Sequence, residues 1–240
     1  VARAGTRWQV HYQLLDAGRE KFAAPEMFVS ADIVVLSAGT LGSTEILLRS
    51  KAAGLSLSDK LGLNFTGNGD VLGFAYNNDH PINGVGFGPH APEGRDPVGP
   101  CITGAIDARN RPELNDGRII EEGSIAGAFA HLLPTTFAAA SALLGVDTDT
   151  GFADWTQEKK REAESLLHGA YRGAVHHTQT LLVMAHDDAG GRLYLEDDRL
   201  RIAWPEAGKQ PIFNKVNQQL EKATAALGGT YVGNPISNRL

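Results

Sequence analysis

The chain contains a single cysteine, Cys101, among its 240 residues. A lone cysteine cannot close an internal disulfide, and it excludes metal sites built from several cysteines. The sequence also has no long run of basic residues, and its formal net charge is −6. Because phosphate contacts supply most of the affinity for DNA and RNA, we expect no nucleic-acid partner. The hydrophobic content of 42% is typical of a globular chain with a packed core.

A transmembrane helix is a second feature that we do not expect in this chain. Residues 124–144 carry no charged side chain and are about long enough to cross a bilayer. They include His131, Pro134 and several Ser and Thr residues, which are unfavourable in lipid. We therefore expect no transmembrane span, and interpret this stretch as a buried helix or an apolar lid over a hydrophobic substrate.

The first part of the chain has the order of elements found at the end of a doubly wound dinucleotide-binding domain. Residues 8–14 alternate between apolar and polar side chains, and residues 26–29 can form the return strand. Residues 32–36 are apolar without alternation, which is typical of a buried strand in a parallel sheet. Helical spacing follows over residues 41–53. We predict a remnant of a parallel sheet in a domain over residues 1–70.

The second part of the chain combines short strands with separate helices. Strand patterns occur at residues 72–76, 101–107, 118–122, 178–185, 191–195 and 199–204. Helical spacing occurs over residues 156–169, with Asp154 or Thr156 as the cap, and over residues 210–227. Hairpin-linked strands with separate helices favour an antiparallel sheet backed by helices. The whole chain is therefore predicted to be α+β, with a second domain over residues 71–240.

Two turns rich in small residues are candidate ligand contacts. The first joins the apolar run to the helix and comprises Ser37, Ala38, Gly39 and Thr40. Small residues let a backbone approach a ligand, and N–H groups at a helix start favour anionic oxygens, although a simple packing turn would have the same pattern. The second comprises Gly67, Asn68, Gly69 and Asp70. Its Asn-Gly pair is the strongest short turn signal, and a tight turn exposes backbone N–H groups.

These two turns, with the residues around them, carry a family resemblance. The segments S-A-G-T-L-G-S-T-E-I-L-L-R-S and F-T-G-N-G-D-V resemble those of the glucose–methanol–choline (GMC) flavoprotein oxidoreductases, in particular the cholesterol oxidase branch. The resemblance is specific over residues 31–77 and looser, but collinear, to the end of the chain. It implies an FAD enzyme that oxidises the CH–OH group of a bulky, apolar alcohol such as a sterol. It also implies that the first turn approaches the adenosine–phosphate side of FAD, and that the second presents N–H groups to the flavin.

Two motifs of that family are absent. The sequence has no G-x-G-x-x-G turn, which holds the FAD pyrophosphate in the family, and no H-P-x-G-G segment with the histidine at the flavin edge. We therefore expect an internal piece of a longer enzyme, or a naturally truncated relative. Its FAD site is expected to be incomplete, and its partners to be the missing N- and C-terminal parts of the same enzyme. We expect this chain to be inactive alone. The alternative is a non-catalytic module that binds a hydrophobic ligand or a partner chain without flavin.

Two adjacent carboxylates, Glu121 and Glu122, end an apolar strand and are the candidate catalytic residues. Neighbours on a strand point to opposite faces, so one carboxylate can enter a cavity while the other faces away. The resemblance implies a substrate-facing Glu on this strand, and the local frame points to Glu122. Such a carboxylate can accept a proton from a substrate hydroxyl. The alternative is a pair of exposed charges at a strand end.

No metal site is expected. His186, Asp187 and Asp188 are metal-ligating types at the end of a predicted strand, but their spacing matches no ligand template. A strand-end turn explains them better, because Asp side chains often bond to the backbone of a turn.

Overall fold

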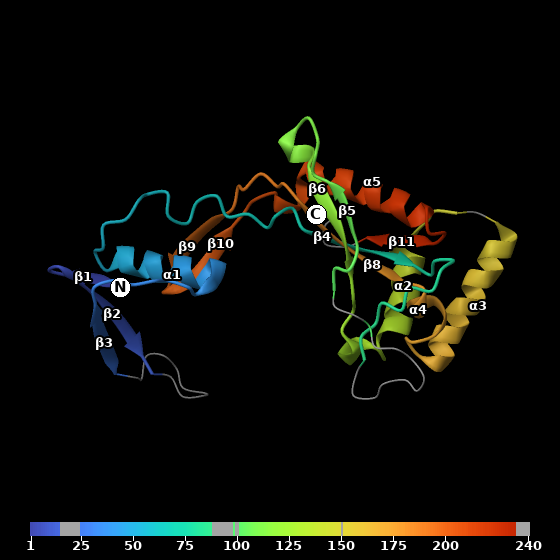
Figure 1. Cartoon of the computed structure of the whole chain (residues 1–240), viewed down its shortest axis with the longest axis horizontal. Coiled ribbons are helices and arrows are strands. Elements are labelled where there is room, and N and C mark those ends of the chain that lie inside the picture. Colours follow the sequence, from blue (N-terminus) through green and yellow to red (C-terminus); the bar gives the residue numbers. More distant parts are fainter. Residues whose placement is uncertain (15–24, 88–97, 99–100, 150, 234–240) are drawn as a thin grey trace. The chain divides into compact units, whose positions relative to one another are not determined.

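The computed structural model describes residues 1–14, 25–87, 98, 101–149 and 151–233 (Figure 1). As predicted, the chain is an α+β protein with helices and antiparallel sheets. It divides into two compact units. The first comprises Val1–Thr66 and Ala189–Pro205, and the second comprises Gly67–Asp188 and Glu206–Leu240.

The first unit contains two small antiparallel sheets and one helix. Its strands are β1 (Ala2–Ala4), β2 (Arg7–Gln13), β3 (Glu26–Ala31), β9 (Arg192–Glu196) and β10 (Arg199–Ala203), and its helix is α1 (Gly39–Ala52). The predicted strands at 8–14 and 26–29, the helix and the late hairpin are confirmed. The hairpin belongs to this unit rather than to the predicted second domain, because Phe65 pairs with Gly191 and the Leu193 N–H donates to the Gly62 carbonyl at 2.7 Å.

The predicted strand at residues 32–36 is wrong. No strand forms there, and the side chains of Ile33 and Val35 are 80% and 82% exposed. An apolar run becomes a buried parallel strand only when strands on both sides pair with it, and the described part of this unit offers no such neighbour. All strand ladders among the described residues are antiparallel. The described residues thus contain no parallel ladder that would support the predicted remnant of a parallel sheet, and this remnant stays a prediction.

The second unit is built on a six-stranded antiparallel sheet, which confirms the predicted sheet type. The strand order is β5 (Ala105–Ala108), β6 (Arg118–Gly123), β8 (Gln179–Ala185), β4 (Val71–Tyr76), β11 (Thr230–Gly233) and β7 (Val146–Asp147). The central strands β8 and β4 are apolar on both faces, and Val183 and Ala75 are fully buried. Both faces of this sheet must therefore be covered by other elements.

Helices cover the two faces of the sheet (Figure 1). On one face α5 (Pro211–Ala225) packs Ile212, Val216 and Leu220 against the central strands. On the other face α2 (Leu133–Leu144) places Phe137 against Tyr76, with 5.5 Å between the ring centroids. The helices α3 (Phe152–His168) and α4 (Gly173–His176) complete this second layer. The unit therefore has two apolar cores, one on each side of one sheet.

The start of α3 differs from the prediction. The helix begins at Phe152, and its N-cap, Gly151, makes no side-chain capping bond. Neither Asp154 nor Thr156 is the cap, because Asp154 lies inside the first turn and the Thr156 hydroxyl donates to the carbonyl of Phe152 at 2.7 Å. The carboxylate of Asp154 is thus held near the positive end of the helix dipole.

Residues 124–144 pack against the sheet. They form a short 3-10 turn at Gly127–Phe129 and then α2, whose Leu133, Pro134 and Phe137 are buried. Within the described ranges, no helix has the length and apolar character required to cross a bilayer.

Removal of the Leu220 side chain should destabilise the second unit. This side chain is fully buried between α5 and the sheet, so Leu220→Ala leaves a cavity and should lower the free energy of unfolding by about 2–5 kcal/mol. Leu167 on α3 is 79% exposed, and Leu167→Ala should change the free energy of unfolding by less than about 0.5 kcal/mol. Urea unfolding followed by circular dichroism measures both. Equal effects of the two substitutions would contradict this packing of α5.

Candidate functional site

An apolar cavity of about 700 Å³ lies within the second unit, on the face of the sheet that α2 covers. This volume is within the range of ligand-binding pockets, roughly 300–1,000 Å³. The cavity is lined by Leu72, Phe74, Ser124, Ile125, Ala126, Phe129, Leu132, Leu133, Thr136, Phe137, Ala140, Leu144, Thr180, Val232 and Gly233. Because nearly all of these side chains are apolar, the cavity is suited to a bulky hydrophobic ligand.

One buried polar atom among the residues that line this cavity has no partner within the described structure. Thr180 on β8 is 5% exposed, and its Oγ1 makes no hydrogen bond within the described structure. A buried hydroxyl without a partner costs about 1–3 kcal/mol. Two other hydroxyl residues line the cavity. The hydroxyl of Ser124 lies 2.8 Å from the Cys101 sulfur, and Thr136 is exposed. Thr180 therefore carries the buried hydroxyl of the lining that a polar atom of a ligand could satisfy.

The side chain of Thr180 occupies space that Gly123 leaves open. Gly123 on β6 pairs with Thr180 across the ladder. A Cβ atom at position 123 would lie 2.8 Å from Thr180 Cγ2, which is closer than real Cβ contacts. The glycine that follows the two glutamates thus allows the Thr180 rotamer to lie over β6.

The structure reverses the predicted orientation of the two glutamates. Glu121 pairs with Leu182, which pairs with Leu72 of the cavity, so Glu121 is on the cavity face of the sheet. It is 7% exposed, and its Oε2 is buried with no hydrogen-bond partner. It does not line the cavity itself, but it is the diagonal neighbour of Thr180 on the same face. The prediction that Glu122 points into the cavity is therefore wrong, and Glu121 is the glutamate on the cavity face of the sheet.

Glu122 faces the opposite side of the sheet and is already bonded. Its Oε2 accepts a hydrogen bond from the Thr103 hydroxyl, and its backbone carbonyl accepts one from the Ile102 N–H at 3.0 Å. The apolar pair before the glutamates, Ile119 and Ile120, gives no alternation from which the inner face could be assigned. The ladder register, rather than the local sequence, decides which carboxylate is inside.

The predicted turn at residues 67–70 is confirmed, but the N–H groups of Gly67, Gly69 and Asp70 are occupied. Asn68 and Gly69 have φ values of 56° and 55°, and the Asp70 N–H donates to the Gly67 carbonyl at 3.1 Å. The N–H groups of Gly67 and Gly69 donate to Asp187 Oδ2 at 2.8 and 3.0 Å. The strand-end residue Asp187 thus binds the turn. The turn does not fit the predicted role of presenting these two N–H groups to a flavin.

Asp70 is within electrostatic reach of two other carboxylates. Burial raises its pKa above the ordinary value, and the negative charges of Asp187 and Glu121 raise it further. Two predicted site residues that are far apart in the sequence, Asp70 and Glu121, thus influence each other through their charges.

The other predicted turn belongs to the first unit and opens α1. The N-cap residue, Ala38, makes no side-chain capping bond, and the first turn of the helix contains no acidic residue. Gly39 has a φ of 70°, and a side chain at this position would meet no atom within 4 Å. Ser37, Gly39 and Thr40 are exposed. This helix start fits an anionic group such as a phosphate.

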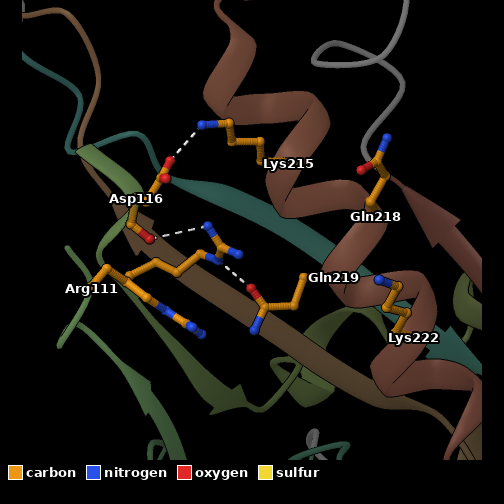
Figure 2. Close-up of a pocket in the computed structure, with 7 residues that line it drawn as sticks. Arg111, Asp116, Lys215, Gln218, Gln219 and Lys222 are labelled. Carbon is orange, nitrogen blue, oxygen red and sulfur yellow. Dashed lines mark hydrogen bonds and ion pairs between the residues drawn. The ribbon is translucent and has the colours of Figure 1, made fainter. Parts of the chain in front are cut away.

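A polar pocket of about 340 Å³ lies on the other face of the sheet, between β6 and α5 (Figure 2). It is lined by Arg111, Asp116, Arg118, Lys215, Gln218, Gln219 and Lys222. Lys215 forms an ion pair with Asp116 (Figure 2). The Arg118 side chain donates to Gln219. Burial, and next the charge of Arg111, lower the pKa of Arg118 below its usual range. The pocket thus has four cations and one carboxylate.

A second charged group gathers carboxylates in the same unit. One oxygen from each of Asp79, Asp149 and Asp154 lies within 4.8 Å of the others, which is a spacing that could hold a metal ion. These residues come from three separate segments, so no ligand spacing in the sequence groups them. Residues close together in the chain, such as His186, Asp187 and Asp188, are not part of this group.

Comparison with models of protein families, with curated proteins and with solved structures finds no match for this chain. A proposal for its function therefore rests on the chemistry and geometry of the cavity and the residues beside it.

Gly123→Ala should destabilise the second unit by roughly 1–3 kcal/mol, because the new Cβ overpacks against the Thr180 methyl group. The double variant Gly123→Ala/Thr180→Ser removes that methyl group and should recover most of the loss. Thermal unfolding of the two single variants and the double variant measures this coupling. If the two substitutions simply add, the Thr180 side chain does not lie over β6 as described.

Proposed function

We propose that this chain is the substrate-binding part of an FAD-dependent oxidoreductase that oxidises the CH–OH group of a bulky, apolar alcohol such as a sterol. The observation that supports this is the apolar cavity of about 700 Å³, whose lining includes one buried, unpartnered hydroxyl, that of Thr180. A rigid hydrocarbon body would fill the cavity, and the alcohol oxygen would bond to Thr180. Burial of an apolar ligand supplies affinity, while one polar contact fixes its direction.

Glu121 is the proposed proton acceptor in place of Glu122. It lies on the cavity face beside Thr180, and one of its carboxylate oxygens has no partner. A hydroxyl bound at Thr180 could pass its proton to this oxygen. Loss of the proton raises electron density on the alcohol oxygen and favours departure of hydride from the adjacent carbon.

FAD, when bound, would accept that hydride. Within this chain, the start of α1 at Gly39 and Thr40 would hold an anionic part of the cofactor. The turn at residues 67–70 is not proposed to hold the flavin, because its N–H groups at Gly67 and Gly69 bind Asp187. FAD binding by this chain thus rests on one of the two predicted turns.

A second function is favoured by the same cavity. A non-catalytic module that binds a hydrophobic ligand would need the apolar lining and Thr180, but neither Glu121 nor flavin. The occupied turn at residues 67–70 supports this alternative. The two functions differ in whether Glu121 affects turnover.

Filling the cavity should weaken ligand binding in both cases. Ala140 lines the cavity, whereas the next residue back on α2, Ala139, is exposed. Ala140→Phe should lower the affinity for a fluorescent sterol at least about tenfold, since it removes volume for the apolar body. Ala139→Phe should bind like the wild type. Fluorescence titration measures both, and equal affinities in all three proteins would exclude this cavity as the binding site.

The role of Glu121 is tested in a flavin-loaded enzyme that contains this chain. Glu121→Gln keeps the size of the side chain but removes the base, so kcat should fall roughly a hundredfold or more. Glu122→Gln is the matched control and should retain turnover. Visible absorbance should show unchanged flavin content in both variants. Loss of turnover in Glu122→Gln alone would show that Glu122, and not Glu121, is the proton acceptor. Sterol binding in a protein without flavin would favour the non-catalytic module.

A further inference from the structure

The carboxylates of Asp79, Asp149 and Asp154 meet at one end of the six-stranded sheet. Thr230 on β11 pairs with Tyr76 on one side and with Asp147 on the other. The last residues of β4 and β7 therefore lie level with each other at the same edge of the sheet. Asp79 follows β4, and Asp149 follows β7. Sheet topology therefore brings these two segments together.

The third carboxylate comes from α3, whose first turn contains Asp154. One oxygen of each of the three residues lies within 4.8 Å of the others. A Cβ atom at Gly228 would lie 2.6 Å from Asp79 Oδ2 and 3.3 Å from Asp149 Oδ2, so the backbone of Gly228 borders the same site. The carboxylates are thus held close together by three separate parts of the fold.

A buried carboxylate on the same helix as Asp154 is a second observation that favours a cation here. Glu158 follows Asp154 by one helical turn, so both side chains lie on the same face of α3. Glu158 is 8% exposed, and its Oε1 is buried without a hydrogen-bond partner. Burial raises the pKa of Glu158 to about 7, and the negative charges of Asp154, Asp147 and Asp149 contribute to the same rise. A buried carboxylate with no partner, placed among other carboxylates, is costly unless a cation is present.

The charges around the cluster are strongly unbalanced. One oxygen of Asp149, Oδ1, is also buried without a partner. The nearest described cation is Arg161, whose Nη1 lies 3.5 Å from Asp79 Oδ1. Arg161 also donates to the side chain and carbonyl of Asn77 at 2.7 and 2.8 Å. One shared guanidinium does not neutralise this number of carboxylates.

We propose that Asp79, Asp149 and Asp154 form a calcium-binding site, with Glu158 as a supporting carboxylate behind it. Calcium prefers 6–8 oxygen ligands at about 2.3–2.6 Å and tolerates irregular geometry, so its opposite ligands lie about 5 Å apart. Oxygens within 4.8 Å of one another fit inside such a shell. Magnesium requires near-octahedral ligands at about 2.0–2.1 Å and retains its water, so carboxylates from three segments favour calcium.

The test uses the whole chain, freed of metal by a chelator. Calcium chloride at about 100 times the dissociation constant should raise the Tm of the second unit by about 5–10 °C, and magnesium chloride should raise it less. Asp149→Asn should remove most of the calcium effect. Asp107→Asn, which changes an exposed carboxylate on β5 of the same unit, should keep it. No rise with calcium, or an equal rise in Asp149→Asn, would overturn the proposal.

Terbium luminescence provides a measurement on the unmutated cluster in case Asp149→Asn does not fold. Trp155 directly follows Asp154 and can transfer excitation to a terbium ion bound there. We expect luminescence on excitation of tryptophan, displacement by calcium, and loss of most of the signal in Trp155→Phe. The Tm rise with calcium should persist in Trp155→Phe. Luminescence that calcium does not displace, or that survives Trp155→Phe, would place the ion elsewhere.

Discussion

The register of β8 between β4 and β6 is the constraint on which the second unit depends. Side chains alternate between the two faces of a sheet, so a shift of one residue would exchange the faces of a whole strand. With the observed register, Val71, Leu181 and Ile120 lie under α5, whereas Phe74, Thr180 and Glu121 lie on the side of α2. The same ladder therefore determines the core, the floor of the apolar cavity and the inner carboxylate.

Local patterns in the sequence were sufficient for most elements of the second unit. Strands such as residues 178–185 and helices such as 210–227 have a periodicity that does not depend on distant partners. The strand predicted at residues 32–36 failed because a parallel strand needs neighbours, which no local pattern contains. For the same reason the choice between Glu121 and Glu122 could not be made locally, since it depends on a register set by β8.

Some of the candidate site residues can be predicted from a sequence pattern, whereas others are identified only by their surroundings in the structure. The turn at residues 67–70 is obvious from Asn-Gly, yet its partner, Asp187, follows the other central strand. Thr180 was hidden in an apolar strand, and only its burial without a partner marks it. Gly123 offered a clue, because a glycine inside a strand pattern often indicates close approach of another group. Polar groups in an apolar cavity are thus found through their missing partners rather than through motifs.

The basic pocket and the carboxylate cluster lie at opposite corners of one sheet. Four strand spacings of about 4.8 Å separate β6 from β7, and Arg118 and Asp147 differ by seven residues of about 3.3 Å along the strands, which corresponds to about 30 Å diagonally. This is roughly three Debye lengths at 0.1 M salt, so the two groups do not neutralise each other. As long as no cation occupies the carboxylate cluster, the second unit therefore has an electric dipole across its sheet. An approaching charged molecule would experience a torque as well as an attraction, and would meet the unit in a preferred orientation.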